Sequence, residues 1–236
     1  MKDTLIRRRA TLASLATQVY EQLRAAIIRG ELAPDAKLVE LELAQKMGTS
    51  QGTIREALHR LEREGLVERR AHRGTYVTIV SLSEIHECFV IRSTIEGFAA
   101  RRAISLMTDA HVHHLEQLHA AMGQAAEKNA LDELIQHDLE FHRCICDWSN
   151  SRLLFNSWMP LYSSIQRFVF QTHPAYFVDL HALADTHLTL IDAFRKRDVE
   201  AAVERIQEHV MLIWSMIDAS PKSGDESNMT ISTNHR

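Results

Sequence analysis

Residues 43 to 58 read Leu43-Ala44-Gln45-Lys46-Met47-Gly48-Thr49-Ser50-Gln51-Gly52-Thr53-Ile54-Arg55-Glu56-Ala57-Leu58, and this stretch decides the fold of the N-terminal part of the chain. Apolar side chains recur at helical spacing on both sides of a short turn. Gly48 ends a first helix over residues 40–47, and Ser50 or Thr49 caps a second over residues 51–64. The stretch therefore predicts a helix-turn-helix over residues 40–59.

The second helix of this pair has one apolar and one polar face. Ile54, Ala57, Leu58 and Leu61 form a predicted buried stripe, which leaves small, polar and basic side chains on the other side. A recognition helix presents such side chains to base edges in the major groove, where Arg pairs with guanine. Arg55 is the best single candidate for a base contact.

A basic hairpin follows the helix pair. Residues 66–70 and 75–80 predict two strands, and the loop between them carries Arg73, which suits phosphate or minor-groove contact. Together with an amphipathic helix from Leu12 to Arg29, these elements predict a winged helix-turn-helix over residues 12–79. The predicted DNA-binding residues are Ser50, Gln51, Gly52, Thr53, Arg55, His59, Arg73 and Gly74.

Four motifs carry a family resemblance: Leu38-x-Glu40-x-x-Leu43-Ala44, Ile54-Arg55-Glu56-Ala57-Leu58, Leu61-Glu62-x-Glu64-Gly65-Leu66-Val67 and Arg73-Gly74-Thr75-Tyr76-Val77. Through them, residues 12–79 resemble the winged helix-turn-helix of GntR-type bacterial transcription regulators. Two positions depart from that family: Asp35 stands where a Gly usually follows Pro34, and Gln51 stands where many members have an Arg after the Ser. The second departure means that a relative's operator sequence is not transferable to this chain.

Composition indicates a two-part cytoplasmic protein. The chain has 236 residues, 45% of them hydrophobic, which is enough to bury two cores. Residues 1–80 carry a net charge of +4 and residues 81–236 one of −8, so the basic half is expected to bind nucleic acid. The three cysteines fit no disulfide framework, and no apolar run is long enough to span a membrane.

The region after residue 80 is predicted to be an antiparallel all-α bundle, so the fold class is mainly α. Caps and helix breakers, Pro174 among them, divide residues 83–218 into six predicted helices. Pro160 interrupts the fourth of these and is expected to kink it. Residues 219–236 are polar and predict a disordered tail. The six helices are residues 83–106, 109–128, 131–148, 151–172, 175–197 and 198–217.

Within this bundle, one carboxylate and three imidazoles are placed to converge. Asp138 and His142 are four residues apart, hence on one helical face. His187 and His209 lie at similar distances from the turn between the last two helices, so they reach the same level in an antiparallel pair. This set suits a divalent transition metal with open positions. A single histidine among the 14 is more often a surface or core residue, and a solvated face is assigned to His111, His113, His114 and His119.

A second resemblance rests on Arg92-x-x-Ile95-Glu96, Asp138-x-x-Phe141-His142, Asn150-x-x-Leu153, Asp185-x-His187 and Glu208-His209. Residues 83–218 resemble the FCD ligand-binding domain of the FadR subfamily, and specifically its metal-containing branch. The resemblance implies that Asp138, His142, His187 and His209 bind Zn or Ni, with Mn, Fe and Co also compatible.

An open metal position attracts a carboxylate, so the expected effector is a small organic acid. Arg92 is a candidate second anchor, although an ordinary i,i+4 pair with Glu96 explains it equally well. Arg167 is a weaker candidate, whose alternative is an ordinary charge on the bundle surface.

These features predict a DNA-binding transcriptional regulator, a repressor by expectation, rather than an enzyme. It is expected to bind a two-half-site operator as a homodimer, because one short recognition helix contacts too few bases for genomic specificity. Two rival hypotheses stay open: a metallohydrolase targeted by its winged domain, and a DNA-binding protein in which the metal is purely structural. The chain lacks the His-Glu-x-x-His arrangement that the first rival requires.

Overall fold

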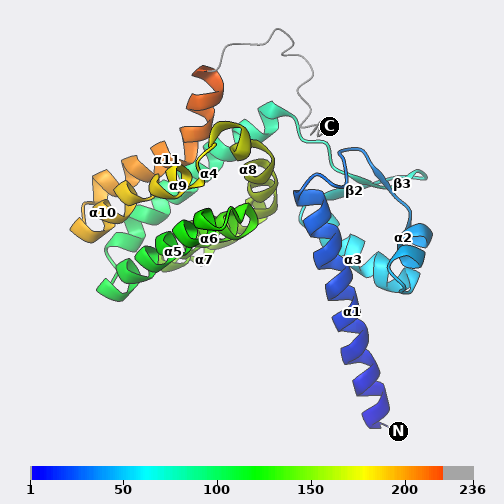
Figure 1. Cartoon of the computed structure of the whole chain (residues 1–236). Helices are drawn as coiled ribbons and strands as arrows, with labels where there is room; N and C mark the ends of the chain where they lie inside the picture. Colours follow the sequence, from blue (N-terminus) through cyan, green and yellow to red (C-terminus); the bar gives the residue numbers. More distant parts are fainter. Residues whose placement is uncertain (1, 220–236) are drawn as a thin grey trace. The chain divides into compact units, whose positions relative to one another are not determined.

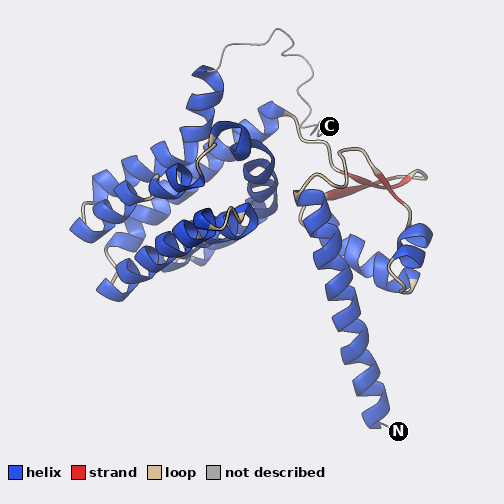
Figure 2. Cartoon of the chain, viewed as in Figure 1, coloured by secondary structure: helices blue, strands red, loops and turns tan. Residues whose placement is uncertain are grey.

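The computed structural model of the chain describes residues 2–219, and their side chains from residue 15 onward. It divides the chain into two units, of which the first ends at Ser81 and the second begins at Leu82 (Figure 1). Helices dominate both units, and the strands that the structure describes belong to the first (Figure 2). No helix among these residues is both long enough and apolar enough to cross a membrane. The predicted tail lies outside the described residues, apart from Ala219, which ends the last helix.

The first unit contains three helices and a small antiparallel sheet. Its helices are α1 (Lys2–Ile28), α2 (Glu40–Lys46) and α3 (Gln51–Arg63), and its strands are β1 (Lys37–Leu38), β2 (Val67–Arg70) and β3 (Gly74–Val77). The strand order is β1-β3-β2, with Val67 opposite Val77 and Arg70 opposite Gly74. The hairpin confirms the predicted wing, whereas β1 was not predicted, because two residues are too few to show an alternating pattern.

The helix-turn-helix forms where the sequence predicts it. Gly48 has φ of 61° and ends the turn after α2, and Gly65 has φ of 71° just beyond α3. The Ser50 side chain accepts a hydrogen bond of 3.1 Å from the backbone N–H of Thr53, which caps α3. All four residues of the predicted apolar stripe of α3 are buried, at 0% exposure each. They pack against α1, whose Ile27 is likewise fully buried.

The second unit is a helical bundle with more helices than the six predicted. It contains α4 (Leu82–Ile104), α5 (Asp109–Glu127), α6 (Leu131–Trp148), α7 (Arg152–Trp158), the 3-10 turn η1 (Met159–Leu161), α8 (Tyr162–Tyr176), α9 (Leu180–Asp185), α10 (Leu188–Lys196) and α11 (Val199–Ala219). The first three predicted helices and the last agree with the structure to within a few residues.

Two predicted helices are wrong as single elements. The predicted fourth helix breaks at η1, where Pro160 cannot donate a backbone hydrogen bond and the chain tightens into a 3-10 turn before α8. The predicted fifth helix is divided into α9 and α10, with His187 between them. Pro174, predicted as a breaker, instead lies inside α8, close enough to its end that the missing hydrogen bond is tolerated.

The core of the bundle positions the helices that carry the site. α4 packs along α11, and α5 along α6. Between α4, α8 and α11 the rings of Phe89, Phe168 and Trp214 contact one another, with the Phe168 and Trp214 rings stacked at a centroid distance of 5.3 Å. Burial of this much aromatic surface fixes the spacing of the helices around the polar side chains described next.

Candidate functional site

Four metal-ligand side chains from different parts of the bundle meet at one point. Asp138 and His142 project from the same face of α6, His187 immediately precedes α10, and His209 lies on α11. Each offers one ligand atom, and these four atoms all lie within 4.8 Å of one another. The convergence predicted from their spacing is therefore present in the structure.

The distances within this cluster suit a cation. His142 Nε2 lies 3.1 Å from His209 Nε2, and His187 Nε2 lies 3.1 Å from Asp138 Oδ1. Ligand atoms held about 2.1 Å from one ion are separated by about 3 to 4 Å. His187 Nε2 is buried and makes no hydrogen bond with the described residues. This nitrogen faces the Asp138 carboxylate oxygen, and both atoms can supply an electron pair. A divalent transition metal between the two atoms fits this arrangement.

Two further groups hold the imidazoles in orientation. The carboxylate of Glu96, on α4, lies 2.7 Å from His142 Nδ1, and the backbone carbonyl of Ala184 lies 3.1 Å from His187 Nδ1. A proton on each Nδ1 leaves each Nε2 lone pair facing the cluster, as in many metal sites. Sequence reasoning assigned Glu96 only as a partner of Arg92 and missed this role, because the contact joins residues 46 positions apart.

Electrostatics keep the cluster negative at its carboxylate and neutral at two of its imidazoles. Burial lowers the pKa of His142, and it lowers that of His209 well below the usual value. Burial raises the pKa of Asp138, but the neighbouring His187, His142 and Arg92 outweigh it, so the net pKa is low. Burial also opposes ionisation of Glu96, but Arg92 and His142 bring its pKa down to about 2. Neutral imidazoles with an ionised carboxylate are the protonation states that a metal ion requires.

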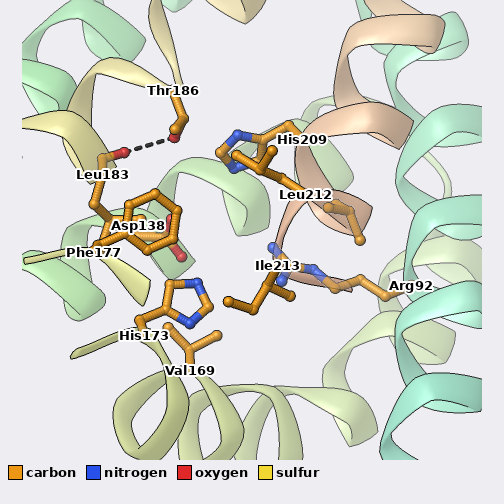
Figure 3. Close-up of a pocket in the computed structure, with 11 residues that line it drawn as sticks. Arg92, Asp138, Val169, His173, Phe177, Leu183, Thr186, His209, Leu212 and Ile213 are labelled. Atoms are coloured by element: carbon orange, nitrogen blue, oxygen red, sulfur yellow. Dashed lines mark hydrogen bonds between the residues drawn. The ribbon is translucent and has the colours of Figure 1, made fainter. Parts of the chain in front are cut away.

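A small cavity adjoins the cluster. It has a volume of about 20 Å³, and Asp138 and His209 border it together with Arg92, His173 and a set of mostly apolar side chains (Figure 3). Arg92 is 3% exposed, and its Nε donates to Glu96 Oε1 at 2.7 Å. Arg92 therefore forms the i,i+4 pair with Glu96 and also lines the cavity, and its role as an anchor for the effector stays a prediction.

Arg167 lies elsewhere. It is buried in α8, at 5% exposure, and burial lowers its pKa, so the alternative of a surface charge is wrong. It is not among the side chains that line the cavity beside the cluster. His173, also on α8, does line that cavity, and sequence reasoning missed it because a histidine in the last turn of a helix carries no distinctive spacing.

A second group with metal-ligand character joins α5 to α6. His114, Glu140 and Cys144 each offer a ligand atom within 4.8 Å of the others, which corrects the assignment of His114 to a purely solvated face. Both carboxylate oxygens of Glu140 already accept hydrogen bonds from Arg143, and burial raises the pKa of the Cys144 thiol to about 12. A protonated thiol and an occupied carboxylate make this group a weaker cation site than the first.

The exposed face of α3 carries most of the predicted DNA-binding residues. Gln51, Gly52, Arg55 and His59 are exposed, and Ser50 caps the helix. Thr53 differs from that expectation, because its side chain is 5% exposed and its hydroxyl lies 2.9 Å from that of Ser50. Thr53 therefore supports the capping turn.

Contacts with neighbouring side chains hold Arg55 and His59 of this face in place. Arg55 is paired with Glu40 at the start of α2, where Arg55 Nη2 donates to Glu40 Oε2 at 2.7 Å. His59 Nε2 lies 3.1 Å from Arg69 Nη2 on β2, which links α3 to the wing. The pair with Glu40 orients the Arg55 side chain, which is nevertheless 53% exposed and therefore accessible.

The wing presents its own exposed residues at the turn between β2 and β3. Arg73 and Gly74 are both exposed there, and Gly74 has φ of 114°, a backbone conformation that favours glycine. The Tyr76 hydroxyl donates to the carbonyl of Arg73 at 3.2 Å, which shapes the turn.

Comparison with known proteins agrees with the division of the chain into two units at Ser81 and Leu82. Residues 15–77 match the bacterial regulatory proteins of the gntR family, and residues 87–211 match the FCD domain. The HTH-type transcriptional repressor RspR of Escherichia coli strain K12 is 29% identical over 196 residues, which cover 83% of this chain and 86% of that protein. A protein of Paenarthrobacter nicotinovorans named "Probable D-xylose utilization operon transcriptional repressor" is 29% identical over 203 residues, covering 86% and 88%.

A solved structure shows the same fold. E. coli McbR/YncC superimposes with a TM-score of 0.67 at 24% sequence identity, covering 86% of this chain and 98% of that one. The matched families and relatives are transcriptional regulators and not enzymes, which excludes the metallohydrolase hypothesis. The chain belongs to the gntR family of bacterial regulatory proteins, with a winged helix-turn-helix followed by an FCD domain, and is a DNA-binding transcriptional regulator.

Proposed function

We propose that this regulator is a metal-dependent repressor of the FadR subfamily whose affinity for its operator changes when a small organic acid binds in the C-terminal bundle. Residues 12–79 form the DNA-binding domain in this proposal, and residues 83–218 the effector-binding domain. A regulator of bacterial transcription meets its operator in the cytoplasm, which is where the protein is proposed to act.

One observation supports the proposal that the C-terminal bundle binds an effector. The four potential metal ligands Asp138, His142, His187 and His209 converge beside a cavity that Arg92 also lines. These four residues would hold a divalent transition metal, Zn or Ni first among the candidates, and the bound metal would supply a Lewis-acidic position for a carboxylate oxygen. The Arg92 guanidinium offers a second, charge-assisted anchor for the same carboxylate. Glu96 holds both Arg92 and His142 in orientation.

The DNA half rests on the exposed face of α3. Arg55 is proposed to contact a base edge, with Ser50, Gln51, Gly52 and His59 around it, while Arg73 and Gly74 of the wing contact the sugar-phosphate backbone or the minor groove. One α3 helix covers a single half-site, so we propose that a homodimer binds an operator of two half-sites. The second copy is proposed to cover exposed apolar side chains of α4, where Ile91 and Phe98 are 51% and 54% exposed.

Effector binding is proposed to change the packing of the bundle helices and thereby the operator affinity of the dimer. A ligand can shift this equilibrium only through a difference in its affinity for the two states. The side chains around the cavity come from α4, α6, α8, α9 and α11, so an acid bound there would contact most of the bundle at once.

The effector half is tested with the purified full chain by elemental analysis and by thermal shifts against small carboxylic acids, with and without a chelator. We expect about one metal ion per chain and a chelator-sensitive shift with at least one acid, which then changes operator affinity. His142→Ala should lose the metal and the response together. His181→Ala, which removes an exposed histidine of α9, is the matched control and should keep both. A metal-loaded protein whose operator affinity responds to no acid would favour the hypothesis of a purely structural metal.

The DNA half is tested with Arg55→Ala in an operator-binding assay. Loss of a bidentate base contact should lower specific affinity by about 1 to 3 kcal/mol while leaving non-specific binding nearly unchanged. Arg63→Ala, on the same helix but at its C-terminal end, is the control and should have a smaller effect that is the same for every DNA sequence. Unchanged specific binding by Arg55→Ala would remove this residue from the interface.

A further inference from the structure

Three side chains with metal-ligand character join α5 to α6, which pack along each other (Figure 1). His114 lies on α5, while Glu140 and Cys144 lie four residues apart on one face of α6, and their ligand atoms are within 4.8 Å of one another. Asp138 and His142 alternate with Glu140 and Cys144 along α6, so the two pairs project from opposite faces of that helix. The group on α5 and α6 is therefore separate from the cluster described above.

The spacing of Glu140 and Cys144 suits an ion between them. Cys144 Sγ donates to Glu140 Oε1 at 3.4 Å. A tetrahedral zinc ion that holds a thiolate at about 2.3 Å and a carboxylate oxygen at about 2.0 Å separates these two ligand atoms by about 3.5 Å. An ion can therefore take the place of the thiol proton without a movement of α6. In that step the S–H bond breaks, a bond between Sγ and the ion forms, and the proton passes to solvent.

The packing around the group restricts its side chains and leaves one side open to solvent. Cys144 is 5% exposed, whereas the Glu140 side chain is 37% exposed. The His114 ring lies edge-on to the ring of Trp148 at a centroid distance of 5.9 Å, and Trp148 in turn stacks on His111. Because this packing already limits the rotation of His114, binding of an ion costs less side-chain entropy. An ion can reach the group from the Glu140 side.

Arg143 competes with an ion for the Glu140 carboxylate. Its Nη2 donates to Oε1 at 2.5 Å and its Nε donates to Oε2 at 2.6 Å. Both partners are about one third exposed, and exposed ion pairs contribute little to stability, so the guanidinium can turn toward solvent. A cation that prefers oxygen ligands finds a single carboxylate in the group and gains too little to displace Arg143. A cation that also binds sulfur and nitrogen gains two further bonds.

We propose that His114, Glu140 and Cys144 form a second cation site, which takes a thiophilic divalent ion, Zn²⁺ first among them. One nitrogen, one oxygen and one sulfur ligand suit such an ion, and three protein ligands leave a fourth tetrahedral position to water. Arg143 and the protonated thiol make this site weaker than the cluster around Asp138, so it fills after that cluster, when the ion is in excess. The bound ion cross-links α5 to α6. The proposal is independent of the effector response proposed above.

Titration of the reduced full chain with Co²⁺ tests the proposal. A thiolate bound to Co²⁺ gives a charge-transfer absorption band in the near ultraviolet, which a site of one carboxylate and three imidazoles cannot give. We expect this band in the wild type, and Cys144→Ser should abolish it. Cys88→Ser makes the same replacement at a partly exposed cysteine of α4 and, as the matched control, should keep the band. His142→Ala should also keep it, which distinguishes failure of this site from failure of the proposed function.

The other two ligands and the competitor are tested by the affinity for Co²⁺ that the band reports. His114→Ala should weaken it by about tenfold or more, because an ion loses a ligand. His113→Ala, at the neighbouring exposed position, is the matched control and should leave it unchanged. Arg143→Met should strengthen it, because the competing cation is removed. If Cys144→Ser does not fold, the effects of His114→Ala and Arg143→Met carry the test. Absence of the band in the wild type, its survival in Cys144→Ser, or an undiminished affinity in His114→Ala would overturn the proposal.

Discussion

Asp35 shows how a single residue departs from its family and is accommodated. Its backbone has φ of 63°, in the left-handed region where the family's usual glycine is unstrained. The Asp35 carboxylate lies 2.6 Å from Arg70 Nη1, on the strand that leads into the wing. Aspartate tolerates this conformation better than most residues, and the ion pair adds a modest stabilisation at an exposed site. The departure is therefore compatible with the fold that the other motifs specify.

The first prediction concerns this position. Asp35→Gly relieves the backbone strain and loses the pair with Arg70, so the two effects should nearly cancel, within about 1 kcal/mol. Asp35→Ala loses the pair and keeps the strain, so it should destabilise the hairpin modestly relative to the wild type and by about 1 to 2 kcal/mol relative to Asp35→Gly. Hydrogen exchange of the wing amides measures both. A stability of Asp35→Ala equal to that of Asp35→Gly would show that the backbone conformation is not strained.

The second prediction concerns pH and Tyr20. The Tyr20 hydroxyl donates to a carboxylate oxygen of Glu64, and burial together with this hydrogen bond raises the pKa of Tyr20 to about 12. Because the folded-state pKa exceeds the unfolded value of about 10, this contribution to stability is complete below pH 10. It is lost as the pH rises through 12. Tyrosinate absorbance should show a late-titrating tyrosine, and Tyr20→Phe should abolish that phase. If the phase remains in Tyr20→Phe, another tyrosine causes it.

At the scale of elements, the helix ends follow local chemistry where a cap or a glycine is present. α3 starts at its Ser50 cap and ends before Gly65, both as predicted from the sequence. Where only a proline marked a boundary, prediction was less accurate. Pro160 produced a change of helix type, and Pro174 produced no boundary at all. A proline removes one hydrogen bond, and packing against neighbouring helices decides whether the helix continues past it.

The third prediction concerns the contact between α4 and α11. A Cβ added at Gly97 would lie 2.8 Å from Gln207 Nε2, the end of a flexible and exposed side chain. Gln207 can rotate away, so Gly97→Ala should be neutral or stabilise the bundle by up to about 1 kcal/mol through higher helix propensity. Gly97→Leu should destabilise it, because a branched side chain needs more room than Gln207 can leave. The three tryptophans, Trp148, Trp158 and Trp214, all lie in this unit, so their fluorescence during urea unfolding measures the effect. A marked loss of stability in Gly97→Ala would mean that the helix backbones themselves must move apart.

At the scale of the whole molecule, the two units differ in what stabilises them. The first depends on an apolar core between α1 and α3, with Ile27, Ile54 and Leu58 fully buried. The second contains buried charged and polar groups in addition to its apolar core, including Arg92, Glu96, Asp138 and His142. Buried groups of this kind stabilise a fold only when they are paired or bind a ligand. The proposed metal is therefore expected to stabilise the second unit alone.

The fourth prediction follows from this difference. Removal of metal by a chelator should lower the melting temperature of the unit that begins at Leu82 and leave that of the first unit unchanged. Trp158 reports on the site directly, because its Nε1 donates to Glu96 Oε1 at 2.7 Å and Glu96 contacts His142. Its fluorescence should change on chelation and recover when metal is added back. A uniform shift of both units, or no shift at all, would contradict a metal bound at this cluster.

The sequence by itself determined the elements whose signals are local. Caps, glycines and periodic apolar residues within a few turns predicted the helix-turn-helix, the wing and the helical class of the second unit. The spacing of Asp138 and His142, four residues apart on one helix, likewise needed no tertiary information to place them on one face. Such elements can be predicted from the sequence because the interactions that form them join residues close together in the chain.

Only the tertiary structure decided which distant side chains share the site. It placed Glu96 against His142, and it placed His173 in the cavity wall. Arg167 is buried away from that cavity, and the Thr53 hydroxyl contacts Ser50 in the capping turn of α3. These contacts depend on how helices break at Pro160 and how aromatic residues space α4, α8 and α11. Packing of that kind is a property of many residues at once, and no single stretch of sequence encodes it.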